Sequence, residues 1–150
     1  MAIEAPLSRY KKQNMLIITA ILIGVGLWFA YDGYKNQDFI EKHTVDGVPD
    51  STLNFNRKAP PFLVGAGVLL GIYFVISRGK KLIAGENEFV SGNTAIPYDA
   101  IEKINKTHFD KRGFFTITYT ENGQSKELTL KDRTYDNLPA VLDHIVSKIS

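Results

Sequence analysis

The sequence predicts a membrane α-helical hairpin followed by a small α+β domain, in which a bent antiparallel sheet is closed by a C-terminal amphipathic helix. Three observations predict this fold class. Two uncharged apolar runs cover residues 15–31 and 59–77. Short β-rich segments with turn residues begin near Lys80, and an apolar stripe with helical spacing ends the chain. The mean hydropathy of −0.11 averages over this segregation and hides it.

Both apolar runs are long enough to cross a bilayer. At about 1.5 Å per residue, they reach about 25–28 Å, close to the ~30 Å hydrocarbon core of a membrane. Neither run has a polar face, and a helix that is apolar all round needs lipid or a large protein core around it. We therefore predict membrane helices over residues 14–32 and 59–77.

The alternative for the first run is a cleaved signal peptide, because basic residues precede it. Its apolar stretch exceeds the usual ~7–15 residues of such a signal. The residues that follow, Trp28 to Tyr31, do not form a small-x-small cleavage site. The sequence favours an uncleaved membrane helix.

Basic residues near the helix ends predict the orientation, because cytoplasmic flanks carry an excess of Lys and Arg. The outer flanks of the two runs hold Arg9, Lys11, Lys12, Arg78, Lys80 and Lys81. The connecting loop holds Lys35, Lys42, Arg57 and Lys58. We predict a cytoplasmic segment 1–13, an extracytoplasmic loop 33–58 and a cytoplasmic domain 78–150. Arg57 and Lys58 adjoin the second helix, so the inverted topology stays open.

Small residues spaced by four occur in both predicted helices, at Ala20 and Gly24 and at Gly67 and Gly71. Such spacing leaves a groove in which two helix backbones can approach closely. The pattern favours packing within the hairpin. The alternative is contact with another membrane subunit or a second copy of the chain. Neither run contains a charged residue or histidine, whereas an ion pathway normally includes one; we do not expect a channel or pump.

The loop contains turn signals at Asp46-Gly47 and Pro49-Asp50. Residues 32–43 can extend the first helix beyond the membrane. A connector of this length can serve as a docking surface, since long loops are often functional. His43, Asp46 and Asp50 are of residue types that bind metal ions, but their spacing matches no standard site.

The C-terminal domain is predicted from alternation and turns. We expect strands over residues 81–84, 88–90, 94–97, 113–120 and 125–131, whereas residues 101–106 are ambiguous between strand and short helix. Asn122-Gly123 is a hairpin turn signal, because both residues tolerate positive φ. The final stripe predicts an amphipathic helix, with an apolar face of Leu138, Val141, Leu142, Ile145 and Ile149.

This arrangement resembles the bacterial pleckstrin-homology-like (PH-like) membrane proteins. The residues that carry the resemblance are Ile96 to Ile101, Gly113 to Thr120 with its hairpin return, and Leu138 to Ile149. The resemblance covers residues 80–150 and the architecture of the hairpin. It implies a PH-like domain on a bacterial cytoplasmic (inner) membrane. Five or six of the seven strands of a full PH fold can be placed.

Motifs for catalysis or cofactor binding are not found in the sequence. The chain has no cysteine and a net charge of +2, which argues against thiolate chemistry and a polyanion-binding arm. The histidines His43, His108 and His144 fall in separate elements, and we expect His108 and His144 to be solvated. We predict no catalytic residue, no metal, no cofactor and no nucleic-acid partner.

We predict a non-catalytic accessory or scaffold protein that docks other membrane or cytoplasmic proteins, as a subunit of a larger complex or as a homo-oligomer. The alternative is a membrane-surface sensor of lipid or ligand. For that alternative, the basic residues of the 103–112 region are the expected headgroup contacts: Lys103, Lys106, Lys111 and Arg112.

Overall fold

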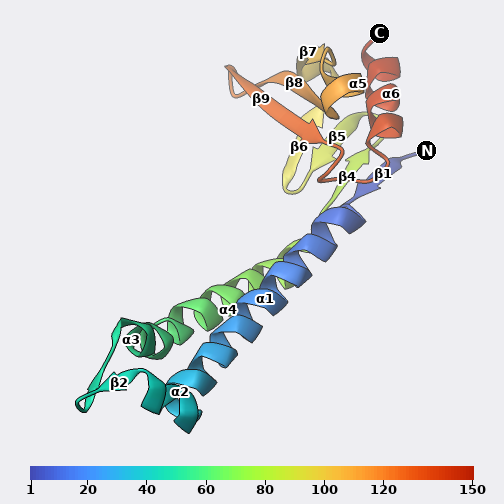
Figure 1. The fold of residues 1–150 in the computed structure, drawn as a ribbon. Coiled ribbons are helices and arrows are strands. Elements are labelled where there is room, and N and C mark those ends of the chain that lie inside the picture. The colour runs from blue at the N-terminus through green and yellow to red at the C-terminus, as the bar shows by residue number, and fades with distance from the viewer. The chain divides into compact units, whose positions relative to one another are not determined.

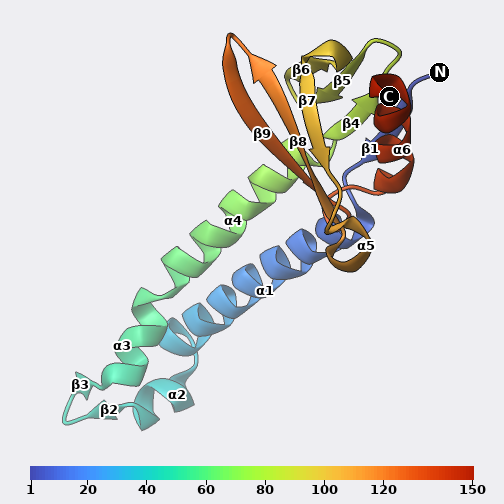
Figure 2. The same ribbon diagram turned by 90° about the horizontal axis from the view of Figure 1, so that it is seen from above.

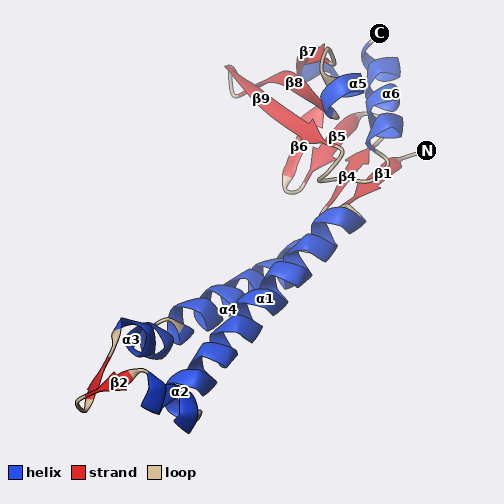
Figure 3. Ribbon diagram, viewed as in Figure 1, coloured by secondary structure: helices blue, strands red, loops and turns tan.

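The computed structural model describes all residues, 1–150, and divides into two compact units (Figure 1). The helix unit comprises residues 13–77, and the sheet unit comprises residues 1–12 together with 78–150. The two units contain long apolar helices and a small α+β sheet domain, respectively (Figure 3). The fold-class prediction is therefore confirmed at this level.

Helix α1 (Arg9–Tyr34) begins before the apolar run, five residues earlier than the predicted boundary at residue 14. The cause is Ser8, whose buried hydroxyl oxygen accepts a hydrogen bond from Lys11 N at 3.1 Å. A serine in this position satisfies an amide at the start of a helix, so the basic residues that follow are helical.

The second long helix is α4 (Pro60–Ser77), and α3 (Ser51–Lys58) leads into it. The two lie nearly in one run, separated at Ala59, where Pro60 and Pro61 lack the amide hydrogens that a continuous helix needs. Helices α1 and α4 lie side by side in both ribbon views (Figure 2). The predicted loop 33–58 is therefore largely structured rather than open.

Between α1 and α3 the chain forms α2 (Gln37–Lys42) and a two-stranded hairpin of β2 (Thr44–Val45) and β3 (Val48–Pro49). The turn between them is Asp46-Gly47, and both residues have positive φ, 52° and 76°. That pair of angles is typical of a type I′ turn, which matches the twist of a hairpin.

The sheet unit holds two antiparallel sheets. The first has the order β1-β4-β5-β6, with β1 Ile3–Pro6, β4 Lys81–Ala84, β5 Glu88–Ser91 and β6 Thr94–Pro97. The second has the order β7-β8-β9, with β7 Ile101–Asn105, β8 Phe114–Glu121 and β9 Gln124–Lys131.

Strand β1 corrects the prediction that residues 1–13 are a separate segment. It pairs antiparallel with β4 in the register Ala5 to Leu82 and Pro6 to Lys81. Leu7 N then donates to Lys80 O at 3.1 Å, and Ser8 N donates to Thr134 O at 2.8 Å. The two ends of the sequence that flank the helices thus fold into one unit.

Turns and short helices connect the remaining strands. Asn122-Gly123 links β8 to β9 with φ of 52° and 74°, as the sequence predicts. The 3₁₀ helix η1 (Tyr98–Ala100) precedes β7, so the ambiguous segment 101–106 is a strand, which ends at Asn105. The single-turn helix α5 (Phe109–Arg112) connects β7 to β8.

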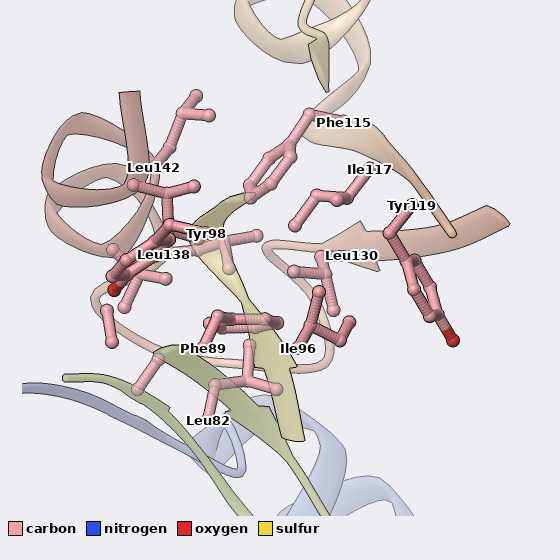
Figure 4. Close-up of a cluster of buried hydrophobic side chains, with 14 residues drawn as sticks. Leu82, Phe89, Ile96, Tyr98, Phe115, Ile117, Tyr119, Leu130, Leu138 and Leu142 are labelled. Atoms are coloured by element: carbon pink, nitrogen blue, oxygen red, sulfur yellow. The ribbon is translucent and has the colours of Figure 1, made fainter. Parts of the chain in front are cut away.

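The core lies between the two sheets and under α6 (Leu138–Ile149), as Figure 4 shows. The first sheet contributes Leu82, Phe89 and Ile96, and the second contributes Phe115, Ile117, Tyr119 and Leu130. Helix α6 closes this space with four of the five residues of the predicted apolar stripe, because Ile149 is exposed. The buried four are Leu138, Val141, Leu142 and Ile145. Burial of these side chains is the main favourable contribution to the fold of this unit.

Ala5 tests whether β1 is an integral strand, because its side chain is fully buried. Ala5→Asp places an unpaired carboxylate in the core, and we expect the sheet unit to lose about 3 kcal/mol of stability. Hydrogen exchange of the β4 and β5 amides in detergent measures this loss. Glu4→Gln is the matched control, because it removes only an exposed ion pair with Lys81, worth about 0–1 kcal/mol. Equal exchange in both variants would contradict the structural role of β1.

Candidate functional site

Glycines set the closest approach between α1 and α4. A Cβ added at Gly67 would lie 2.6 Å from Ile23 Cγ1, and one added at Gly26 would lie 2.8 Å from Val64 Cγ2. Near the loop, a Cβ at Gly33 would lie 2.9 Å from the backbone oxygen of Asn56. Real Cβ atoms do not tolerate such distances, so these three glycines allow the backbones to come together.

The four predicted packing residues differ in whether they contact the other long helix. Gly67 lies at the close approach, and Gly71 has ordinary contact, with Thr19 Cγ2 at 3.6 Å from its added Cβ. Ala20 and Gly24 are exposed, and no atom lies within 4 Å of a Cβ added at Gly24. Gly24 therefore lies outside the close approach of the two helices, and Ala20 one turn before it is exposed.

The sequence signal that would have identified the α1 side of this contact is the pair Gly26 and Gly33, spaced by seven residues. Two turns of helix bring residues seven apart back to one face, just as residues four apart share a face. Spacing alone does not say which of two small-residue faces meets the partner helix. Ala20 and Gly24 therefore leave a small-residue face open on α1.

The helix unit exposes apolar side chains along both long helices. In each span, only 11% of an apolar 18-residue stretch is buried within the structure. Both spans are long and apolar enough to cross a membrane. Trp28, Leu69 and Ile76 have relative exposures of 64%, 68% and 69%. A soluble protein rarely exposes so large a contiguous apolar surface.

Arg57 holds the loop end of the helix unit together. Its Nε donates to Gly33 O at 2.7 Å, and its guanidinium carbon lies 5.7 Å from the centroid of the Tyr34 ring. The Tyr34 hydroxyl donates back to Arg57 O at 3.0 Å. Arg57 therefore has a structural role at the base of the loop. In a count of charges along the sequence, the same residue favours the inverted topology.

His43 and Asp50 form the second polar contact of the loop. His43 Nδ1 lies 2.8 Å from Asp50 Oδ2, and the other carboxylate oxygen accepts from Leu53 N at 2.8 Å, so Asp50 caps α3. The hydrogen bond from Leu53, followed by that from His43, lowers the pKa of Asp50. No group of three or more His, Cys, Asp or Glu side chains is placed to hold a metal ion.

The four predicted headgroup contacts separate into two pairs. Lys111 and Arg112 lie on α5 and line a hollow of about 630 Å³. Lys103 on β7 and Lys106 in the following turn are exposed but do not line it. The other side of the hollow comes from the end of β9 and the residues after it, with Lys131, Asp132 and Arg133.

Sequence reasoning missed Lys131 and Arg133, because about twenty residues separate them from α5. Asp132 N donates to Gly113 O at 2.8 Å and brings the two segments together. Gly113 has φ of 69°, and the Asp132 carboxylate occupies the space that a Cβ would fill. No sequence motif marks this backbone contact.

The histidines of the sheet unit are not equivalent. His108 is exposed and lies beside Phe114, with ring centroids 5.3 Å apart. His144 is half-buried, and its Nε2 lies 2.9 Å from Gly85 O, which also accepts from the Tyr98 hydroxyl at 2.8 Å. His144 therefore links α6 to the β4–β5 turn, which corrects the expectation that it is a solvated helix residue.

Comparison with known proteins found no matching family model, and neither the curated proteins nor the solved structures gave a significant match.

Gly67 and Gly24 provide a matched test of the helix contact. Gly67→Ala forces Ile23 to shift, and we expect about 1–3 kcal/mol of destabilisation. Gly24→Ala meets no atom and improves helix propensity, so its effect should be neutral or stabilising by up to about 1 kcal/mol. Thermal unfolding in a mild detergent compares the two variants. If both lower the midpoint equally, α1 and α4 do not pack as described.

The lowered pKa of Asp50 predicts that the stability of the loop depends on pH. Because its pKa is lowered in the folded chain, ionised Asp50 stabilises the loop above its unfolded pKa of about 4. This stabilisation is lost as the pH falls through the lower folded value. We expect the hydrogen-exchange protection of the Leu53 amide to fall at low pH, after correction for the intrinsic exchange rate. Asp50→Asn keeps a capping oxygen without the charge, so its protection should be insensitive to pH. An equal response in both proteins would contradict the assignment.

Proposed function

We propose that this chain is a non-catalytic integral membrane accessory protein, in which the helix unit is a membrane hairpin and the sheet unit is a PH-like domain. The hairpin docks other membrane subunits or further copies of the chain, and the domain presents a protein-binding surface at the cytoplasmic face of a bacterial inner membrane. The observation that carries the docking proposal is the open small-residue face of α1, at Ala20 and Gly24.

The exposed apolar side chains of α1 and α4, together with the lengths of these helices, support membrane insertion. The apolar run of α1, residues 15–31, and the 18 residues of α4 present apolar side chains on nearly all sides. In water this surface would be unfavourable, at about 25 cal/mol per Å² of apolar area. In a bilayer the same side chains contact lipid chains, and the helical hydrogen bonds satisfy the backbone.

The pairing of β1 with β4 supports an even number of membrane crossings. Residues before α1 and after α4 belong to the same sheet, so both flanks of the hairpin must lie on one side of the membrane. The six basic residues of these flanks favour the cytoplasmic side.

The sheet topology supports the PH-like assignment. The unit has the seven strands of its four-stranded and three-stranded sheets, and a final helix packs against them. Strand β1 supplies the strand that sequence reasoning could not place. In this arrangement the membrane hairpin is an insertion between the first two strands of the domain.

Strand β9 supports a role in protein binding. It is the edge of the second sheet, and of its eight residues only Leu130 is buried. An edge strand presents unpaired backbone groups to which an extended segment of a partner can add. This edge lies in the sheet unit and is independent of the membrane helices.

Small-to-large substitution tests docking through α1. Gly24→Leu adds bulk to the open face at a position where an added Cβ meets no atom within 4 Å, so we expect the chain to lose its associated subunits while its fold is retained. Ala66→Leu is the control, since Ala66 is an exposed small residue of α4. Native mass measurement after gentle detergent extraction reports the assembly.

Recovery of the unmodified chain as a monomer in every mild detergent would contradict the docking proposal. Equal dissociation by the two substitutions would show that the Ala20–Gly24 face is not the contact.

A further inference from the structure

The two sheets of the sheet unit have four edge strands, and β9 differs from the other three. Strands β1 and β6 are four residues long and end in a proline, Pro6 and Pro97. Strand β7 has a bulge between Ile101 and Lys103. Short length, proline and bulges keep an edge from pairing with another chain. Strand β9 has eight residues, no proline or glycine, and an unbroken register with β8. It is therefore the edge that is open to pairing.

The tight turn between β8 and β9 determines which backbone groups of β9 point outward. In a two-residue hairpin the flanking pair, here Glu121 and Gln124, is hydrogen bonded, and bonded pairs then alternate along the ladder. Asp132 N donates to Gly113 O at 2.8 Å, as this alternation requires. The odd-numbered residues of β9 therefore direct their N–H and C=O groups to the free edge: Ser125, Glu127, Thr129 and Lys131.

The side chains of β9 have a symmetric pattern about Thr129. Leu128 and Leu130 flank this residue, and Glu127 and Lys131 follow on either side with opposite charges. A second β9 that runs antiparallel and is centred on the same threonine places leucine opposite leucine and lysine opposite glutamate. Pairs of these kinds stabilise an antiparallel sheet, whereas like charges destabilise it. The edge is therefore complementary to a copy of itself.

Neighbouring registers do not give this match. Residues with outward backbone groups pair only with each other, so the register changes in steps of two residues. Centring the pair on Leu128 places Lys126 opposite Leu130, and centring it on Leu130 places Leu128 opposite Asp132. Each leaves a charge against an apolar side chain, which is unfavourable. In the register centred on Thr129, Lys126 and Asp132 oppose each other instead.

The same register continues the apolar side of β9 from one copy to the next. Leu130 is buried, and Leu128 is half-buried and packs against the core. A two-fold axis through Thr129 keeps the core-facing sides of both strands on one face, so Leu130 of one copy covers Leu128 of the other. In such a contact one patch serves both copies, and the assembly closes as a dimer.

We propose that two copies of this chain pair through β9, antiparallel and centred on Thr129, so that their three-stranded sheets form one continuous sheet. The inference rests on the protein-binding role proposed for this edge and names its partner. The outward N–H and C=O groups of Thr129 bond to those of the same residue in the second copy. Glu127 and Lys131 form an ion pair on each side of the axis.

A cysteine at the two-fold axis tests the register. The chain has no cysteine, so Thr129→Cys introduces one thiol per copy. Directly opposed residues of a hydrogen-bonded pair have Cα atoms about 5.5 Å apart, which suits a disulfide. We expect mild oxidation of the full-length chain in mild detergent to give a covalent dimer that a reductant reverses. Ser125→Cys is the matched control, because its two copies would lie about 27 Å apart in this register.

Charge reversal tests the ion pairs. Glu127→Lys and Lys131→Glu each place like charges opposite one another on both sides of the axis. Each variant alone should dimerise about thirtyfold more weakly, which corresponds to about 2 kcal/mol. An equimolar mixture of the two should dimerise as the unmodified chain does, because every pair is then of opposite charge. Lys106→Glu, an exposed reversal outside β9, is the control.

Native mass spectrometry after gentle detergent extraction reports the dimers, with one charge variant isotope-labelled so that mixed pairs are recognised by mass. All variants are also prepared with Gly24→Leu, so that association through α1 does not mask the result. Glu127, Thr129 and Lys131 are exposed, and we expect every variant to remain folded. Hydrogen exchange of the β8 amides checks this.

Three results would overturn the inference. The first is no covalent dimer from Thr129→Cys, or equal yields from Thr129→Cys and Ser125→Cys. The second is a failure of the two charge variants to dimerise when mixed. The third is a bound protein of different mass that Glu127→Lys releases, which would assign the edge to another partner.

The outcomes separate this inference from the docking proposal for α1. Absence of the covalent dimer, with an assembly that Gly24→Leu still dissociates, would reject only the pairing of β9. A covalent dimer from Thr129→Cys, with an assembly that Gly24→Leu leaves intact, would reject only the contact through α1.

Discussion

The pairing of β1 with β4 is the constraint on which the rest of the structure depends. Residues 3–6 and 81–84 are separated in sequence by the entire helix unit, yet they are neighbours in one sheet. Their pairing closes a long loop, and the entropy cost of closing a loop grows only slowly with its length. The buried side chains of Ala5 and Leu82 offset that cost in the core. Because the two strands run antiparallel, the chain leaves the sheet through Ser8 and returns through Lys80 on the same side.

Polar contacts are concentrated where the chain enters and leaves the long helices. At one end Ser8 caps α1 and bonds to Arg133 O. At the other, Arg57 bonds to Gly33 O, and Asp50 caps α3. Between these ends the glycine contacts of α1 and α4 leave little room for side chains. This distribution suits a helix pair in lipid, where close backbone packing replaces the hydrophobic effect as the source of association.

The sequence predicted the elements whose signal is local. The apolar runs, the Asn122-Gly123 turn and the stripe of α6 each carry a periodicity or a turn preference that few neighbouring residues determine. Three features escaped prediction because they depend on partners distant in sequence. Strand β1 is four residues long and is stabilised by β4. Gly26, rather than Gly24, meets α4, because the rotation of α1 depends on its partner. His144 is fixed by Gly85, which lies in a different turn.

Backbone contacts between distant segments also form the hollow that Lys111, Arg112, Lys131 and Arg133 line. Strand β1 leads into Ser8, Ser8 bonds to the segment that contains Arg133, and Asp132 bonds to Gly113 beside α5. Within the sheet unit, these contacts connect the strand that precedes α1 to the segment beside Lys111 and Arg112.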